Sequence, residues 1–375
     1  MDMDTSIVGA AGTKAARGTG ATGLDWAVAA ASILFVGGAW LDAWAHDNLP
    51  ATLETFFTPW HAILYAGLLA AAVTLSWAAI RNHARGVSWH GALPDGYGLS
   101  ALGVAAFAAG GVGDMLWHVF FGIEVGLEAL LSPTHLLLAA GATLVASGPL
   151  RAAWLRPGSR SGAVPLPALL SLGLTVSVLV FFTAYANPFG IPWPDSQFDL
   201  ARFDFSVVPA ESGVQDGPVY AATEGLGRAL GVTGILLQAG ILMGAMLLAA
   251  RRWVLPFGAA TLVFSLALVP SVFPHGYYLF VPVAVLGGLI SDVLLRYPAA
   301  GRSGASRLFA FAAPAGLYAL YFVALALTGG LSWPVELWAG TVVLAGAVGM
   351  LVAFLAASSD APPSSETSPG KPTAA

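Results

Sequence analysis

The strongest constraint on the fold is a series of apolar runs, each long enough to cross a lipid bilayer as an α-helix. One crossing needs about 20 predominantly apolar residues. Charged residues make up only 9% of the chain, whereas soluble domains carry roughly 25%. We therefore expect an all-α, polytopic membrane bundle of ten transmembrane helices. The expected spans are 24–45, 60–80, 99–121, 133–154, 166–186, 223–250, 256–273, 276–296, 308–328 and 335–357.

The distribution of cationic residues orients these spans. With ten spans, thirteen of the 15 Lys and Arg residues fall on one side of the membrane, and only Arg202 and Arg228 fall on the other. Cytoplasmic loops of membrane proteins carry an excess of Lys and Arg. Both termini are therefore expected in the cytoplasm, and the membrane is expected to be a plasma membrane of bacterial or archaeal type.

The predicted organisation is one transmembrane domain between two disordered tails. The first residues are rich in Gly, Ala and Thr, and the last are rich in Ser, Pro and Thr. A long acidic stretch after the fifth span is expected on the extracytoplasmic side, either as a lid or as a plain connector. The predicted boundaries are 1–22 for the N-terminal tail, 23–357 for the transmembrane domain, 187–222 for the acidic loop and 358–375 for the C-terminal tail.

A polar motif occurs twice within the first four spans. In both copies an Asp precedes a His by four residues, and a Glu precedes a second His by seven. The second His follows a hydroxyl residue and a proline in both copies. Each copy covers two spans, at about 24–80 and about 99–154, which predicts an internal two-helix repeat. The motif residues are Asp42, His46, Glu54 and His61 in the first copy, and Asp114, His118, Glu128 and His135 in the second.

The spacing predicts that each copy gathers its polar side chains at one end of a hairpin. The Asp and the first His, four residues apart, share one face at the end of a helix. The hydroxyl residues Thr58 and Ser132 are typical N-caps, and the prolines that follow them are typical first helical residues. The second His then lies in the first turn of the next helix, where the helix dipole favours neutral imidazole. All of these groups are expected at the extracytoplasmic ends of the first four spans.

Imidazole and carboxylate groups at membrane depth are costly unless they are paired, line a cavity or bind a metal. The chain has no cysteine, so the ligands available are nitrogen and oxygen, a set that suits copper, zinc, non-haem iron or manganese. Without a metal, the same groups could form interhelical hydrogen bonds or meet interfacial water. The predicted metal ligands are Asp42, His46, His61, Asp114, His118 and His135, with Glu54, Glu128 and His275 as additional candidates.

The stretches Asp42–His61 and Asp114–His135 resemble the metal motif in the C subunit of the copper membrane monooxygenases, the particulate methane and ammonia monooxygenase family. Members of that family are membrane-embedded and oxidise small hydrocarbons or ammonia with dioxygen. The resemblance implies that copper is the metal, with non-haem iron or zinc as alternatives. It also implies an oxidoreductase that acts on a small apolar molecule. On this basis Asp42, His46 and His61 would be metal ligands, and the second copy would repeat them.

Other functions remain open. A transporter of metal ions or small solutes would line a path across the bilayer with polar groups. Here these groups gather at one end, and Asp292, expected to pair with Arg296, is the clear polar group at the other. Four imidazoles could also hold haem, although the carboxylates would then be superfluous. A structural or sensory protein needs no metal at all.

The expected partners follow from the same composition. The bilayer surrounds the apolar spans, and further membrane subunits or a homo-oligomer remain open. A net charge of −5, spread along the chain, gives no basis for a nucleic-acid partner.

Overall fold

The structure is a computed structural model that describes residues 21–49, 58–122, 127–156, 162–198, 218–296 and 302–357. These residues form helices and no strand, apart from two isolated bridges, so the all-α class is confirmed for the described part of the chain. The α-helices are α2 (Ala21–Asn48), α3 (Pro59–His83), α4 (Gly98–Phe121), α5 (Glu128–Leu131), α6 (Pro133–Ala146), α7 (Gly148–Leu155), α8 (Leu166–Phe182), α9 (Pro218–Arg252), α10 (Ala259–Leu268), α11 (Phe280–Arg296), α12 (Arg302–Leu327) and α13 (Val335–Ala357). The 3₁₀ helices η2 (Trp89–Gly91), η3 (Ala184–Ala186) and η5 (Val269–Val272) lie between them.

Six helices in the described residues are long and apolar enough to cross a membrane, and the chain is a membrane protein. They are Gly23–Asn48, Pro59–His83, Gly98–Phe121, Gly225–Arg252, Arg307–Leu327 and Val335–Ala356. The bent pair α6 and α7 is a seventh candidate if it counts as one span. Each of the ten predicted runs coincides with a helix or a pair of helices. The number of crossings and the side on which the termini lie stay predictions.

Proline explains why several apolar runs are broken. Pro149 follows Gly148 at the junction of α6 and α7, where the axis bends by 46°. Pro270 lies in η5, which follows directly from the ten-residue α10. Because proline has no backbone N–H and crowds the preceding turn, it interrupts the helical hydrogen bonds in an apolar segment without making that segment polar.

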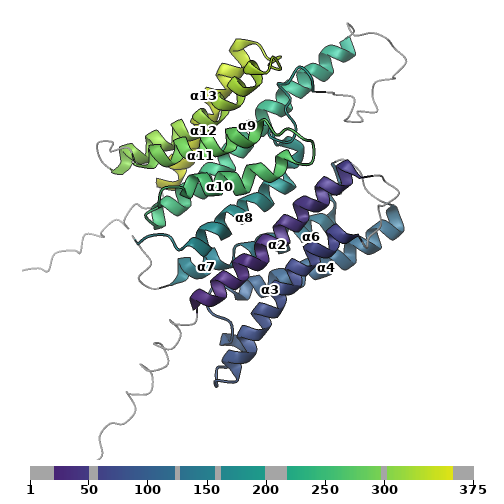
Figure 1. The fold of residues 1–375 in the computed structure, drawn as a ribbon, viewed down its shortest axis with the longest axis vertical. Helices are drawn as coiled ribbons and strands as arrows, with labels where there is room; N and C mark the ends of the chain where they lie inside the picture. The colour runs from purple at the N-terminus through teal and green to yellow at the C-terminus, as the bar shows by residue number, and fades with distance from the viewer. Residues whose placement is uncertain are drawn as a thin grey trace, which may run out of the picture.

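The helices form one bundle in which two hairpins stand on one side (Figure 1). Helix α2 packs along α3, and α4 packs along α6. Helix α8 lies between α2 on one side and α10 on the other, and α9 to α13 make up the remaining side of the bundle. The two hairpins therefore pack against α8 through α2 and α6.

The two hairpins close through glycines at equivalent positions. In the first, a Cβ on Gly38 would lie 2.6 Å from Leu64 Cα, and one on Gly67 would lie 2.3 Å from the backbone nitrogen of Phe35. In the second, a Cβ on Gly110 would lie 2.9 Å from Leu138 Cδ2, a side-chain atom, and one on Gly141 would lie 2.7 Å from the backbone nitrogen of Phe107. Small residues allow helices in a membrane to approach closely. Glycines at equivalent positions therefore lie at the helix contact of both hairpins, and the approach is closer at Gly38 than at Gly110.

The expected pairing of Asp292 with Arg296 is wrong. Asp292 is fully buried and accepts hydrogen bonds from the backbone nitrogens of Ala260 and Thr261, at 2.9 and 3.1 Å. It also accepts a bond of 2.6 Å from the Thr261 hydroxyl. The carboxylate thus caps the first turn of α10 from the neighbouring helix α11, where free N–H groups and the helix dipole favour a negative charge. The guanidinium of Arg296 lies 4.9 Å from the ring centre of Phe257 instead.

Candidate metal centre

The helix ends that carry the first copy of the motif form as the sequence predicts. Asp42 and His46 lie in the last two turns of α2, which ends at Asn48. Thr58 caps α3, because its side-chain oxygen accepts a hydrogen bond of 3.2 Å from the backbone nitrogen of His61. Pro59 is the first helical residue. The cap therefore fixes His61 in the first turn of α3, opposite the end of α2.

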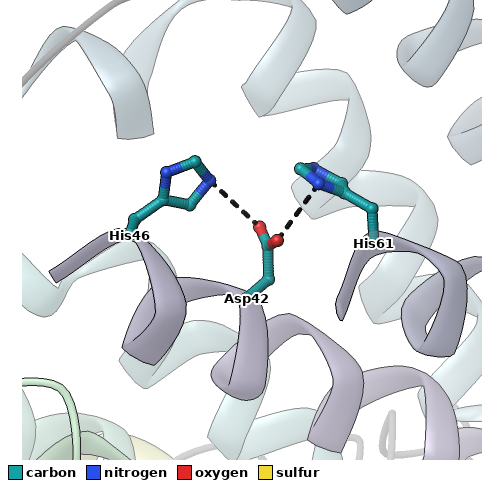
Figure 2. A group of neighbouring side chains, drawn as sticks. All are labelled: Asp42, His46 and His61. Atoms are coloured by element: carbon teal, nitrogen blue, oxygen red, sulfur yellow. Dashed lines mark ion pairs between the residues drawn. The ribbon is translucent and has the colours of Figure 1, made fainter. Parts of the chain in front are cut away.

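Asp42 joins the two imidazoles of the first copy (Figure 2). Its Oδ2 lies 3.6 Å from His46 Nε2, and its Oδ1 lies 3.2 Å from His61 Nδ1. One ligand atom from each of these three residues lies within 4.8 Å of the other two. The two imidazole rings are 6.1 Å apart at an interplanar angle of 85°. We call this group the first centre.

The second copy has nearly the same geometry. Asp114 Oδ2 lies 3.3 Å from His118 Nε2, and Asp114 Oδ1 lies 3.3 Å from His135 Nδ1. The imidazole rings are 6.2 Å apart. Ser132 precedes α6 as its N-cap residue, and its Oγ lies 2.8 Å from His135 Nδ1. Asp114, His118 and His135 form the second centre, although its ligand atoms do not converge as closely as those of the first.

The two centres differ in how one carboxylate oxygen is held. In the second centre, the Thr134 hydroxyl donates a hydrogen bond of 3.1 Å to Asp114 Oδ1. In the first centre, the equivalent position is Trp60, and the buried Asp42 Oδ1 has no hydrogen-bond partner. A buried carboxylate oxygen without a hydrogen bond is unfavourable unless a cation compensates its charge. In the first centre, therefore, Asp42 Oδ1 has the contact with the His61 imidazole at 3.2 Å but no hydroxyl donor equivalent to Thr134.

The carboxylates lie deeper than most of the imidazoles. The side chains of Asp42 and Asp114 are 16% and 12% exposed, whereas that of His46 is 41% exposed. The first centre is therefore accessible from the side of His46, at the end of α2. A ligand that binds there would meet imidazole first and the carboxylate behind it.

One hydrogen bond of His118 indicates which of its two ring nitrogens carries the proton, and therefore which nitrogen faces the Asp114 carboxylate without one. His118 Nδ1 lies 3.1 Å from the carbonyl oxygen of Gly122, and a carbonyl only accepts. We therefore assign the proton of the neutral ring to Nδ1. Nε2 then directs a lone pair towards Asp114 Oδ2, 3.3 Å away. Two lone pairs that face each other repel unless a proton or a metal ion lies between them. In metal sites, an imidazole that binds the metal through one nitrogen commonly donates a hydrogen bond from its other nitrogen to a backbone carbonyl, as His118 does here.

Tyr65 lies between the two centres, and the motif comparison did not identify it. Its ring stacks on His61 with centroids 6.4 Å apart. Its hydroxyl lies against α4, where a Cβ on Gly111 would be 2.7 Å from the phenol oxygen. Tyr65 follows His61 by four residues, so the helical period places both on one face. Gly111 precedes Asp114 by three residues, and Tyr65 therefore connects the first centre to the helix that carries the second.

The three additional candidates are placed differently. Glu54 lies outside the described residues, and Glu128 begins the short helix α5 but its side chain is not described. His275 Nε2 lies 3.7 Å from Asp47 Oδ2, and Asn48 Nδ2 donates a hydrogen bond of 2.8 Å to the carbonyl of Pro274. His275 therefore contacts the end of α2 through the residue that follows His46. It is not part of the group whose ligand atoms converge on Asp42.

A buried charged cluster at the opposite end of the hairpins was also missed. Asp25, at the start of α2, is only 2% exposed. It accepts hydrogen bonds from the Tyr97 hydroxyl at 2.6 Å and from Arg156 Nη2 at 2.7 Å. A lone Asp at the start of an apolar run and an Arg distant in sequence form no local pattern, so the pairing required the fold. The cluster ties the starts of α2 and α4 to the end of α7.

Comparison of the chain with protein-family models, with curated proteins and with solved structures gave no match.

Proposed function

We propose that this protein is a membrane-embedded metalloprotein that binds a transition-metal ion at Asp42, His46 and His61. The observation that carries the proposal is the convergence of one carboxylate and two imidazoles from two helices, with ligand atoms within 4.8 Å of one another. Two donors bound at about 2.0–2.2 Å to one tetrahedral ion are separated by roughly 3.3–3.6 Å. The oxygen–nitrogen distances of 3.2 and 3.6 Å agree with that separation. The oxygen of the 3.2 Å contact, Asp42 Oδ1, has no hydrogen-bond partner and is therefore a free acceptor for the ion.

We infer that the two hairpins are copies of one unit and that the second centre binds a metal ion too. The glycine contacts, the end-of-helix Asp and His and the first-turn His recur at equivalent positions in both. Thr134 would not bind the metal itself, but its hydrogen bond would orient the Asp114 carboxylate that does. The more loosely spaced donors of this centre then close around the ion when it binds.

Two imidazoles and one carboxylate leave coordination positions free for a substrate or for dioxygen. Sites of this kind occur with copper, zinc and non-haem iron, and sites with free positions are typically catalytic. Copper is our first choice because the motif resembles that of the copper membrane monooxygenases. A bound copper ion would supply redox chemistry with dioxygen. The protein itself would hold the ion through the imidazoles and balance its charge with the carboxylate.

An apolar cavity large enough for a small molecule lies in the same part of the bundle. A cavity of about 470 Å³ lies between α2, α8 and the α10–η5 segment. Trp40, Leu41 and Trp44 line it from α2, and Trp40 and Trp44 lie on the side of that helix opposite to Asp42 and His46. Small-molecule sites are concave and mostly apolar, with few polar groups. The proposed activity is oxidation of a small apolar molecule that partitions into the membrane. This activity rests on the motif resemblance, and the cavity would hold such a molecule on the far side of α2 from the centre.

Elemental analysis tests this proposal most directly. The protein is purified in detergent from cells supplied with copper, iron and zinc, and the metals are quantified by mass spectrometry. We expect two ions per chain in the wild type, one in His61→Ala and one in His135→Ala. His90→Ala, which removes an exposed imidazole from η2 between α3 and α4, is the control and should retain both. Metal-free wild-type protein, or unchanged content in both centre variants, would exclude the proposed ligands.

A further inference from the structure

The C-terminal half contains an irregular segment that is buried rather than exposed. Helix α8 ends at Phe182, and after η3 the chain runs without helix from Asn187 to Phe198. Residues 186–194 are all buried. The segment is fastened to the α12–α13 connection, where the backbone nitrogen of Ser332 donates a hydrogen bond of 2.8 Å to the carbonyl of Pro194. Non-helical backbone inside a membrane protein is tolerated where protein covers it or where it lines a polar cavity, and transporters place substrate sites at such breaks.

Three fully buried side chains around this segment carry a polar atom without a hydrogen-bond partner. They are Asn187, Gln238 of α9 and Tyr318 of α12, each 0% exposed. The atoms concerned are Asn187 Nδ2, Gln238 Oε1 and the Tyr318 hydroxyl. A buried polar group without a partner costs free energy, and the cost is greatest where the surroundings are apolar. Three such groups in one part of the bundle leave donors and acceptors that a single small ligand could satisfy.

Hydrogen bonds and a ring contact connect the elements that carry the three side chains. Gln238 Nε2 donates a hydrogen bond of 2.9 Å to the Thr183 hydroxyl, and Thr183 precedes Asn187 by four residues across η3. The Tyr321 hydroxyl donates a bond of 3.2 Å to the carbonyl of Pro188, the residue after Asn187. The ring of Tyr321 lies 6.2 Å from that of Tyr318. The three side chains therefore belong to elements that contact one another.

The existing hydrogen bonds determine what each group offers. Asn187 Oδ1 accepts a bond from the backbone nitrogen of Phe189, so the amide nitrogen is the free donor. The Thr183 hydroxyl donates to the carbonyl of Leu179 and accepts from Gln238 Nε2, so Gln238 Oε1 is the free acceptor. The Tyr318 hydroxyl can donate or accept. The three side chains carry no charge.

We propose that Asn187, Gln238 and Tyr318 form a binding site for a small neutral amide. The carbonyl oxygen of such a solute accepts from Asn187 Nδ2, and its N–H group donates to Gln238 Oε1. The Tyr318 hydroxyl provides a third hydrogen bond to either end. A charged solute is disfavoured because the site has no counter-charge and lies among apolar helices. This site is separate from the two metal centres and does not depend on them.

Saturation-transfer nuclear magnetic resonance with acetamide tests the proposal on the full-length, metal-depleted protein in detergent. We expect a saturable acetamide signal for the wild type and none for acetate, the charged analogue of similar size. Gln238→Leu and Tyr318→Phe should each weaken binding by at least tenfold. Ser291→Ala, which removes a buried hydroxyl already bonded to the Gly287 carbonyl on α11, is the matched control and should bind as the wild type does.

Two results would overturn the site. The first is the absence of a saturable acetamide signal from wild-type protein whose helical content is intact by circular dichroism. The second is equal binding by the wild type and Tyr318→Phe, a variant that keeps the ring and its packing. If the three groups bind no solute, Tyr318→Phe should instead raise the unfolding temperature, because it removes an unpaired buried hydroxyl.

Discussion

Phe35 of α2 and Phe107 of α4 meet edge to face at the contact between the two hairpins, with ring centroids 4.7 Å apart. Phe35 packs on Gly67 in the first hairpin, and Phe107 packs on Gly141 in the second. Asp42 lies seven residues beyond Phe35, and Asp114 lies seven beyond Phe107, about two helical turns in each case. The packing that joins the hairpins therefore places both carboxylates at the same end of the bundle.

The close contact of Gly38 near the first centre predicts that alanine substitutions at Gly38 and at the adjacent Gly37 have different effects on stability. A Cβ on Gly38 would lie 2.6 Å from Leu64 Cα, whereas a Cβ on Gly37 meets nothing within 4 Å. We expect Gly38→Ala to destabilise the protein by about 1–3 kcal/mol, because α3 must move away from α2. Gly37→Ala, the control, should leave stability unchanged. Thermal unfolding in detergent measures both, and equal unfolding temperatures would show that the hairpin is not close-packed at Gly38.

The local signals of the candidate site could be predicted from the sequence. Thr58 and Pro59 begin α3 as an N-cap and first-turn proline should, and this places His61 opposite Asp42. Such signals act over one turn, and they are read directly from neighbouring residues. The distances between the motif side chains depend also on how closely α2 packs against α3. The apolar pattern indicates that the two helices are neighbours, but it does not give the distance between them.

Features that depend on distant residues could not be predicted. Asp292 shares a helix face with Arg296, but the free N–H groups of Ala260 and Thr261 bind its carboxylate more favourably. The pairing of Asp25 with Arg156 spans most of the N-terminal half of the chain. The predicted loop at 187–222 begins with residues that are buried, because the segment packs between α9 and the α12–α13 connection. An apolar, proline-rich stretch can be a surface loop or a buried break, and composition does not separate them.

Thr134 should control metal affinity at the second centre only. Its hydroxyl donates to Asp114 Oδ1, and Trp60 occupies the equivalent position in the first centre. Loss of a hydrogen bond that orients a metal ligand typically weakens binding by about 10- to 100-fold. We expect that loss for Thr134→Val in a His61→Ala background, in which only the second centre binds. Competition with a chelator of known affinity measures it.

The control for this experiment is Thr143→Val on the same helix. The Thr143 hydroxyl donates to the Ala139 carbonyl, one turn away within α6, and has no contact with the centre in the described residues. Its substitution should leave chelator competition unchanged. If Thr134→Val and Thr143→Val behave alike, the Thr134 hydroxyl does not orient a metal ligand.

Acid should release the bound metal. Protons compete with the ion for imidazole nitrogens, and unperturbed imidazole is protonated around pH ~6.5. We expect the metal content after dialysis to fall as the pH is lowered from about 7.5 to about 5.5, and to recover when the metal is supplied again at the higher pH. Circular dichroism at each pH confirms that the helices persist. Retention of the full metal content at the lowest pH would indicate that imidazoles are not the ligands.

Alkaline pH should weaken the cluster at the opposite end of the hairpins. Tyr97 precedes α4 and is fully buried, and burial together with the neighbouring Asp25 carboxylate raises the pKa of its hydroxyl well above 10. The folded protein therefore keeps this proton at a pH where the unfolded chain loses it. The resulting stabilisation is complete below pH ~10 and is lost as the pH rises further.

Tyr97→Phe isolates this contribution, because it removes the hydroxyl that donates to Asp25 but keeps the ring. A hydrogen bond to a charged group contributes about 1.5–3 kcal/mol, so the variant should be less stable than the wild type at pH ~8. The difference should shrink above pH ~10, where the wild type loses its advantage. Tyr278→Phe, at an exposed tyrosine, is the control and should track the wild type throughout. A difference between Tyr97→Phe and the wild type that stays constant from pH ~8 to ~11 would show that the hydroxyl proton does not stabilise the fold.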